Sequence, residues 1–116
     1  MHKIDVVIPM HNSSRWVRDT LDSLLEQRPC LGKVICVDNN STDDSCEVVQ
    51  AWAQAHPNVQ LRLIEERTPG ACAARNTGLR EVNTTWVQFL DSDDLLEPQK
   101  MATQLALGHD HDMVCL

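Results

Sequence analysis

Two carboxylates that stand one residue apart, Asp91 and Asp93, follow the apolar run 86–90. Such a run is typical of a buried strand, and open α/β sheets place their ligand sites at the carboxyl ends of strands. Carboxylates at alternate positions project to opposite faces of a strand, but they can converge on one cation where the strand gives way to a loop. The pair therefore predicts a site for Mg²⁺ or Mn²⁺ that holds a diphosphate.

Two further polar clusters begin where other apolar runs end. The first contains Pro9, His11 and Asn12, and the second begins at Asp38. The carboxyl ends of parallel strands meet at one edge of a sheet. We therefore expect both clusters to lie beside Asp91.

The side chains at this edge suit a nucleotide. An ionised Asp38 only accepts hydrogen bonds, so it could bind the imide N–H or the exocyclic amine of a base. The ring of His11 could stack on that base. Arg75, on a helix that begins near Pro69, carries planar donors that could bridge phosphate oxygens. These residues predict a nucleotide that lies across the edge, with its diphosphate at the metal.

Short apolar runs alternate along the chain with helical patterns, which predicts a parallel sheet covered by helices. The predicted strands are 4–9, 33–37, 60–64, 85–90 and 112–116, and the predicted helices are 14–27, 43–55, 69–81 and 98–107. Right-handed crossovers place the first strand between the second and the fourth. The predicted fold class is α/β, with three α/β/α layers and a mostly parallel, Rossmann-like sheet that is truncated after about five strands.

Length and charge limit the partners. The 116 residues, 42% of them hydrophobic, fit a single domain over 1–116, which is small for a complete two-substrate enzyme. The formal charge of -7 argues against nucleic acid or an anionic membrane as the main partner. An anionic ligand would need a metal or a local arginine to offset that charge.

The cysteines and the amino terminus favour a cytoplasmic protein. The 5 cysteines include no C-x-x-C pair, so neither a disulfide framework nor a structural zinc site is predicted. No signal peptide is visible, and no apolar stretch approaches the ~20 residues that span a bilayer. We expect no membrane span in this segment, and a location in the cytoplasm or at the inner face of a membrane.

Four sequence blocks, at 7–12, 37–43, 70–78 and 89–94, resemble in order and spacing those of the family 2 glycosyltransferases, which have the GT-A fold. Together they extend over most of the chain. The resemblance implies a nucleotide-sugar donor, most often a UDP-sugar, and a divalent metal, Mn or Mg. It also implies inverting transfer of the sugar to the hydroxyl of a glycan, lipid or other acceptor.

The resemblance further implies roles for residues that share positions with the family's motifs: a base wall at Pro9 and Asn12, a base contact at Asp38, a phosphate contact at Arg75, a nucleoside or sugar contact at Asp91, and a metal contact at Asp93. His11 replaces the commoner Tyr, and Asn39 and Asn40 stand where Asp and Gly are frequent. The catalytic base and the acceptor-binding region of such enzymes lie downstream of the metal motif. We therefore expect them beyond Leu116, and we expect the fragment alone to bind donor without efficient transfer.

Other interpretations stay open. Asp91 and Asp93 could form a solvated turn with a helix cap, and Arg75 could be a surface charge. The fragment could be a nucleotide-binding module without transferase activity. A signalling receiver domain fits poorly, because the first strand ends without acidic residues. The open edge of the sheet could also pair with a second copy of the chain.

Overall fold

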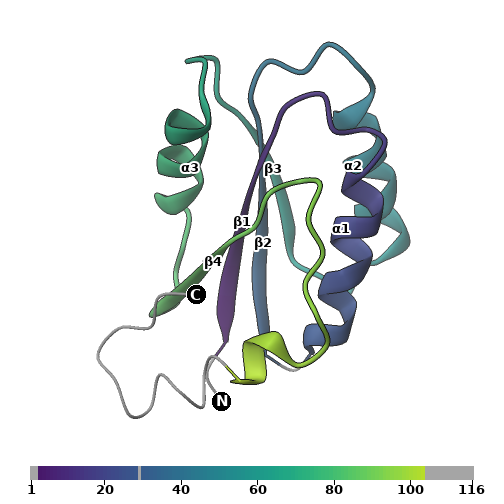
Figure 1. The fold of residues 1–116 in the computed structure, drawn as a ribbon, viewed down its shortest axis with the longest axis vertical. Helices are drawn as coiled ribbons and strands as arrows, with labels where there is room; N and C mark the ends of the chain where they lie inside the picture. Colours follow the sequence, from purple (N-terminus) through teal and green to yellow (C-terminus); the bar gives the residue numbers. More distant parts are fainter. Residues whose placement is uncertain (1–2, 29, 104–116) are drawn as a thin grey trace.

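The computed structural model describes residues 3–28 and 30–103. Its sheet is parallel, with the order β3-β2-β1-β4 (Figure 1), so β1 lies between β2 and β4 as predicted. The strands are β1 at Ile4–Met10, β2 at Leu31–Asp38, β3 at Leu61–Glu65 and β4 at Trp86–Phe89. The fifth predicted strand, 112–116, lies outside the described residues.

Helices cover both faces of the sheet (Figure 1), which confirms the three-layer α/β/α class. On one face lie α1 at Val17–Leu24, which continues into a short 3-10 turn, and α2 at Ser45–Ala55; α3 at Ala71–Leu79 covers the other face. The first helix begins three residues later than predicted, because the backbone after Ser13 forms a turn in which the Trp16 N–H donates to the Ser13 carbonyl.

Alternation along the strands divides the core between the two layers. Ile8 and Cys36 belong to the larger core under α1 and α2, whereas Val7 and Val37 pack with Ala74 under α3. Gly78 allows α3 to lie close to the sheet, since a Cβ at this position would collide with the side chain of Val7. The strands are therefore held from both sides, and their carboxyl ends are fixed relative to one another.

Pro9 lies inside β1 and does not close it, so the predicted end of this strand was one residue early. The pairing of β1 with β4 ends at Val7, whose carbonyl accepts the Leu90 N–H as the last bond between the two strands. Alternate residues of a central parallel strand bond to opposite neighbours, and Met10 bonds toward β2. Pro9 therefore faces the side where β4 has ended, and its missing N–H breaks no ladder bond.

The amino end of the sheet is closed by a buried carboxylate. Asp5 is 2% exposed, and its two oxygens accept the N–H groups of Lys33 at 2.7 Å and Asn83 at 2.8 Å. Its own N–H donates to the hydroxyl of Thr84 at 3.0 Å. Both carboxylate oxygens are thus satisfied by backbone, which joins β2 to the turn before β4.

Candidate functional site

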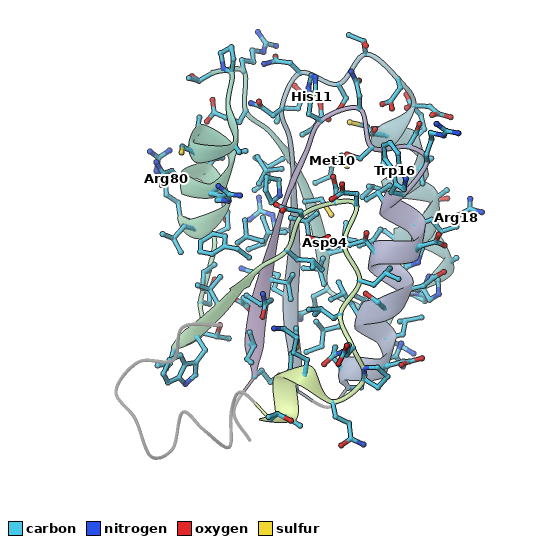
Figure 2. All side chains as sticks on the ribbon, viewed as in Figure 1. Met10, His11, Trp16, Arg18, Arg80 and Asp94 are labelled. Carbon is cyan, nitrogen blue, oxygen red and sulfur yellow. The ribbon has the colours of Figure 1, made fainter. Side chains whose placement is uncertain are left out.

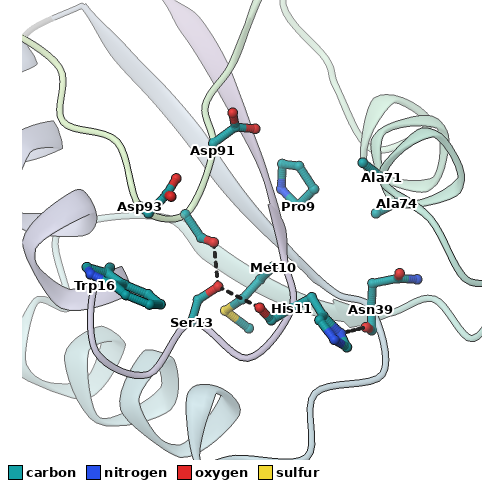
Figure 3. A pocket seen from close by; sticks show the side chains of 11 residues that line it. Pro9, Met10, His11, Ser13, Trp16, Asn39, Ala71, Ala74, Asp91 and Asp93 are labelled. Atoms are coloured by element: carbon teal, nitrogen blue, oxygen red, sulfur yellow. Dashed lines mark hydrogen bonds between the residues drawn. The ribbon is translucent and has the colours of Figure 1, made fainter.

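A pocket of about 270 Å³ opens at the carboxyl edge of the sheet (Figure 3). It lies where the winding of the sheet reverses, between the connections that run from β1 toward β3 and the one that returns to β4. Four predicted site residues line it, namely Pro9, His11, Asp91 and Asp93, together with Met10, Ser13, Trp16, Asn39, Ala71, Ala74 and Ser92.

The loop after β4 carries three exposed carboxylates. Asp91, Asp93 and Asp94 each offer an oxygen, and these oxygens all lie within 4.8 Å of one another. Hard divalent cations prefer such ligands, so the donor set fits Mg²⁺ or Mn²⁺. The sequence assigned no role to Asp94, although it extends the predicted pair. The guanidinium of Arg75 lies 3.5 Å from an Asp91 oxygen, an exposed pair at the margin of the pocket.

The loop after β1 forms one wall of the pocket. His11 Nδ1 lies 2.6 Å from the carbonyl oxygen of Asn39, which only accepts, so Nδ1 carries the hydrogen. In the neutral ring Nε2 is then an acceptor. Figure 2 shows His11 and Trp16 near this end of the sheet, on the segment that leads into α1.

Asn12 does not line the pocket. Its backbone adopts a left-handed conformation, with φ of 49°. Its side-chain oxygen accepts the N–H of Thr42 at 2.7 Å, and its own N–H donates to the hydroxyl of Ser41 at 2.9 Å. Asn12 therefore joins the loop after β1 to the loop after β2 by hydrogen bonds.

Asp38 and Asn39 face different layers, as neighbouring residues at a strand end do. Asp38 is 7% exposed, and among the described residues its Oδ1 has no hydrogen-bond partner. It lines a second pocket of about 200 Å³, not the main one. Asn39 lines the main pocket, a position that sequence reasoning noted only as a departure from the family pattern.

The side chain of Asn39 is used within the protein. Its Nδ2 donates to the carbonyls of Glu66 and Thr68, both at 2.8 Å, and its Oδ1 accepts the N–H of Gly70 at 2.9 Å. These bonds hold the loop before α3. Gly70 there has a φ of 117°, which favours glycine.

The first turn of α3 forms the opposite wall of the pocket. Ala71 and Ala74 line it with small side chains. The free N–H groups at a helix amino terminus favour an anion. Small side chains leave that terminus accessible.

Sequence reasoning missed two residues of the pocket, Trp16 and Ser92. The spacing of Trp16 predicts a packing residue, yet its side chain is 46% exposed and lines the pocket, with the Arg15 guanidinium 5.8 Å from the ring centroid. Ser92, between the two predicted acids, is 9% exposed and hydrogen-bonds to Ser13. The spacing misleads at Trp16 because this residue precedes α1, and no periodicity marks Ser92 because it lies in a loop.

With this geometry in hand, comparison with known proteins gives the class. The chain matches the sequence model of Glycosyl transferase family 2 over residues 5–116, and it belongs to that family. Its fold is that of the GT-A glycosyltransferases.

Among the relatives, the uncharacterized glycosyltransferase YibD of Escherichia coli (strain K12) is 30% identical over 112 residues, which are 97% of this chain and 32% of that protein. Glycosyltransferase GlyA of Streptococcus pneumoniae serotype 4 is 34% identical over 101 residues, 87% of this chain and 14% of that protein. The chain therefore spans a third or less of the length of these relatives.

Two solved structures are similar. S. aureus TarS 1-349, in complex with UDP, has a TM-score of 0.81 and 26% identity, covering 95% of this chain and 33% of that one. The mannosyltransferase PcManGT from Pyrobaculum calidifontis, in complex with GDP-Man and Mn²⁺, has a TM-score of 0.79 and 33% identity, covering 89% and 31%. Over the part of the chain that is described, no helix is long and apolar enough to cross a membrane.

Proposed function

We propose that this chain is the donor-binding part of a glycosyltransferase that takes a sugar from a nucleotide-diphosphate sugar, with a UDP-sugar as the first candidate. In this proposal a divalent metal holds the diphosphate, and the sugar passes with inversion to a hydroxyl acceptor. The convergence of Asp91, Asp93 and Asp94 within 4.8 Å, beside a pocket walled by His11 and Ala71, carries the proposal.

Each wall of the pocket would take one part of the donor. The base would lie at the His11 ring, and the diphosphate between the start of α3 and the acidic loop. Arg75 would leave Asp91 for a phosphate oxygen, since the 3.5 Å contact between them is long and exposed. Asp38 would accept an N–H group of the ligand at its unpartnered oxygen.

The acidic loop needs a cation to receive a diphosphate, because carboxylates and phosphates repel each other. A bound metal supplies positive charge for the departing diphosphate. The chain's own residues bind and orient the donor. A base outside residues 1–116 would take the proton from the acceptor hydroxyl.

The solved relatives support a nucleotide and a metal together, since one complex contains UDP and another contains GDP-Man with Mn²⁺. The short span of the chain supports a second candidate. Because it covers 32% of the E. coli relative, the fragment alone could bind nucleotide without transferring sugar. An assay of sugar transfer on a longer chain separates the two.

Calorimetry of the chain with UDP-glucose, with and without Mn²⁺, tests the proposal. We expect binding that strengthens with Mn²⁺ and that Asp93→Asn weakens by about tenfold, through loss of one metal ligand. Glu26→Gln, an exposed residue of the 3-10 turn away from the pocket, is the control because it changes the net charge equally. Binding that ignores both Mn²⁺ and Asp93→Asn would contradict the proposal.

A further inference from the structure

We propose that Ser13, Thr20 and Ser92 are positioning residues that hold the acidic loop in its metal-binding shape and couple it to the wall that carries His11. This inference rests on the proposed function, because it concerns how the same metal site is built. None of the three side chains needs to touch the metal or the nucleotide.

The middle residue of the acidic motif is anchored, although its neighbours are exposed. Ser92 is 9% exposed, Ser13 is 3% exposed and Thr20 is fully buried. The Ser92 hydroxyl lies 2.5 Å from that of Ser13, and the Ser92 carbonyl accepts the Thr20 hydroxyl at 2.9 Å. Both the side chain and the backbone of Ser92 are therefore fixed by the segment between β1 and the middle of α1.

The Ser13 hydroxyl links two segments. It lies 2.5 Å from the Ser92 hydroxyl and 3.2 Å from the His11 carbonyl (Figure 3), so it joins the acidic loop to the segment that carries His11. Ser45 holds Ser13 from the other side, by accepting its N–H at 2.8 Å. His11 in turn donates to the carbonyl of Asn39. One line of bonds thus runs from the acidic loop to the loop that holds α3.

This anchoring opposes a repulsion within the loop. Asp91, Asp93 and Asp94 place three carboxylates within 4.8 Å, and like charges at that spacing favour a spread loop when no cation is bound. A fixed Ser92 leaves the two flanking residues less freedom to spread. The site then needs less ordering when a metal binds.

A purely structural role makes a different prediction. Removal of a buried hydrogen bond would lower the stability of the fold, but a folded variant would bind metal as the wild type does. A positioning role requires that the affinity for metal changes in the folded protein. It also requires a change in the factor by which the metal strengthens nucleotide binding.

The experiment measures Mn²⁺ affinity of the full chain by electron paramagnetic resonance, and UDP affinity with and without Mn²⁺ by calorimetry. We expect Ser92→Ala and Thr20→Val to weaken Mn²⁺ binding by about tenfold, the usual effect of a residue that supports metal ligands. Thr20→Ser keeps the hydroxyl and should bind Mn²⁺ within twofold of wild type. Ser13→Ala should reduce the strengthening of UDP binding by Mn²⁺.

Thr84→Val is the matched control, because it removes a hydroxyl that accepts the Asp5 N–H and donates to the Trp86 carbonyl at the opposite end of the sheet. It should lower the unfolding midpoint and leave Mn²⁺ affinity unchanged. Circular dichroism establishes whether each variant is folded. If Ser92→Ala does not fold, the comparison of Thr20→Val with Thr20→Ser tests the inference instead. If wild type binds Mn²⁺ and Thr20→Val binds it equally, only this inference is overturned. If wild type binds no Mn²⁺, the proposed function is overturned with it.

Discussion

Two buried aspartates occupy opposite ends of the same sheet, and they are partnered differently. Asp5, at the amino end, is 2% exposed, and both of its oxygens accept backbone N–H groups. Asp38, at the carboxyl end, is 7% exposed, and its Oδ1 has no partner among the described residues. Burying a carboxylate is costly unless its oxygens accept hydrogen bonds, so the first arrangement stabilises the fold and the second does not.

This contrast between the two ends of the sheet is visible without reference to the family. At the amino end both oxygens of Asp5 accept backbone N–H groups. At the carboxyl end Asp38 retains accepting capacity, and Asp91, Asp93 and Asp94 stand exposed in the loop after β4. Unsatisfied polar groups concentrate where a ligand binds. That Asp38 contacts a base stays a prediction, and its side chain lines the neighbouring pocket and not the main one.

Replacement of Asp5 should give the largest effect. Asp5→Ala takes the acceptor away from the N–H groups of Lys33 and Asn83, whose bonds to this buried carboxylate are partly buried, and this should cost about 3 kcal/mol of unfolding free energy. Urea denaturation measures this loss, with Asp19→Ala on the exposed face of α1 as the control. Nucleotide affinity of the folded variant should not change. A loss below about 1 kcal/mol would show that these N–H groups find other partners.

Asp38→Asn should have the opposite sign on stability. It replaces a buried charge, which lacks one hydrogen bond, by a neutral side chain of the same shape, so the free energy of unfolding should stay equal or rise by about 1 kcal/mol. UDP affinity should fall by about tenfold if Asp38 accepts an N–H of the base. Urea denaturation measures the change in stability, and calorimetry measures the change in UDP affinity. A marked loss of stability would place Asp38 in the same class as Asp5.

Much of the fold and part of the candidate site could be predicted from the sequence. Apolar runs and right-handed crossovers predicted the four described strands and the place of β1 between β2 and β4, because burial on both faces and chain handedness leave few alternatives. The convergence of Pro9, His11, Asp91 and Asp93 at one pocket followed from the parallel sheet.

The remainder depends on details that periodicity does not encode. Whether Asp38 or Asn39 faces the main pocket depends on where β2 ends, and a shift of one residue exchanges the two faces. The anchoring of Ser92 by Ser13 joins loops far apart in the chain. Trp16 precedes the first turn of α1, where helical spacing does not yet apply.

A thiol beside Asp38 gives a smaller test that needs no ligand. Burial first, and then the negative charge of Asp38, raise the pKa of Cys46 to about 11. Asp38→Asn should lower this pKa in part, because burial remains, so Cys46 should react faster with iodoacetamide at pH 9. Peptide mapping by mass spectrometry separates it from the exposed Cys72, whose rate should not change and serves as the internal control. An unchanged Cys46 rate would mean that burial alone, without Asp38, sets the reactivity of this thiol.

The smallest effect concerns an acid at the carboxyl edge that serves structure. Asp43 accepts the Ser45 hydroxyl, the Ser45 N–H at 3.0 Å and the Ser14 N–H at 3.2 Å. The Ser45 hydroxyl is the main reason that its pKa is lowered from 3.8 to about 2. Because the folded pKa lies below the unfolded one, this stabilisation is complete above pH 3.8 and is lost as the pH falls toward 2.

In Asp43→Asn the urea midpoint should therefore fall less between pH 4 and pH 2 than it does in the wild type. At pH 7 the midpoint should change little, apart from a small decrease from the loss of charge-assisted hydrogen bonds. The exposed Asp19→Asn on α1 is the control for the change in net charge. Ser45 also accepts the Ser13 N–H, so acidification should loosen the segment that anchors Ser92 before the sheet itself unfolds. Amide hydrogen exchange at Ser13, followed from pH 5 to pH 3 after correction for the intrinsic rate, measures this order. Exchange at Ser13 that tracks global unfolding at every pH would show that Asp43 supports the whole fold, as Asp5 does at the other end.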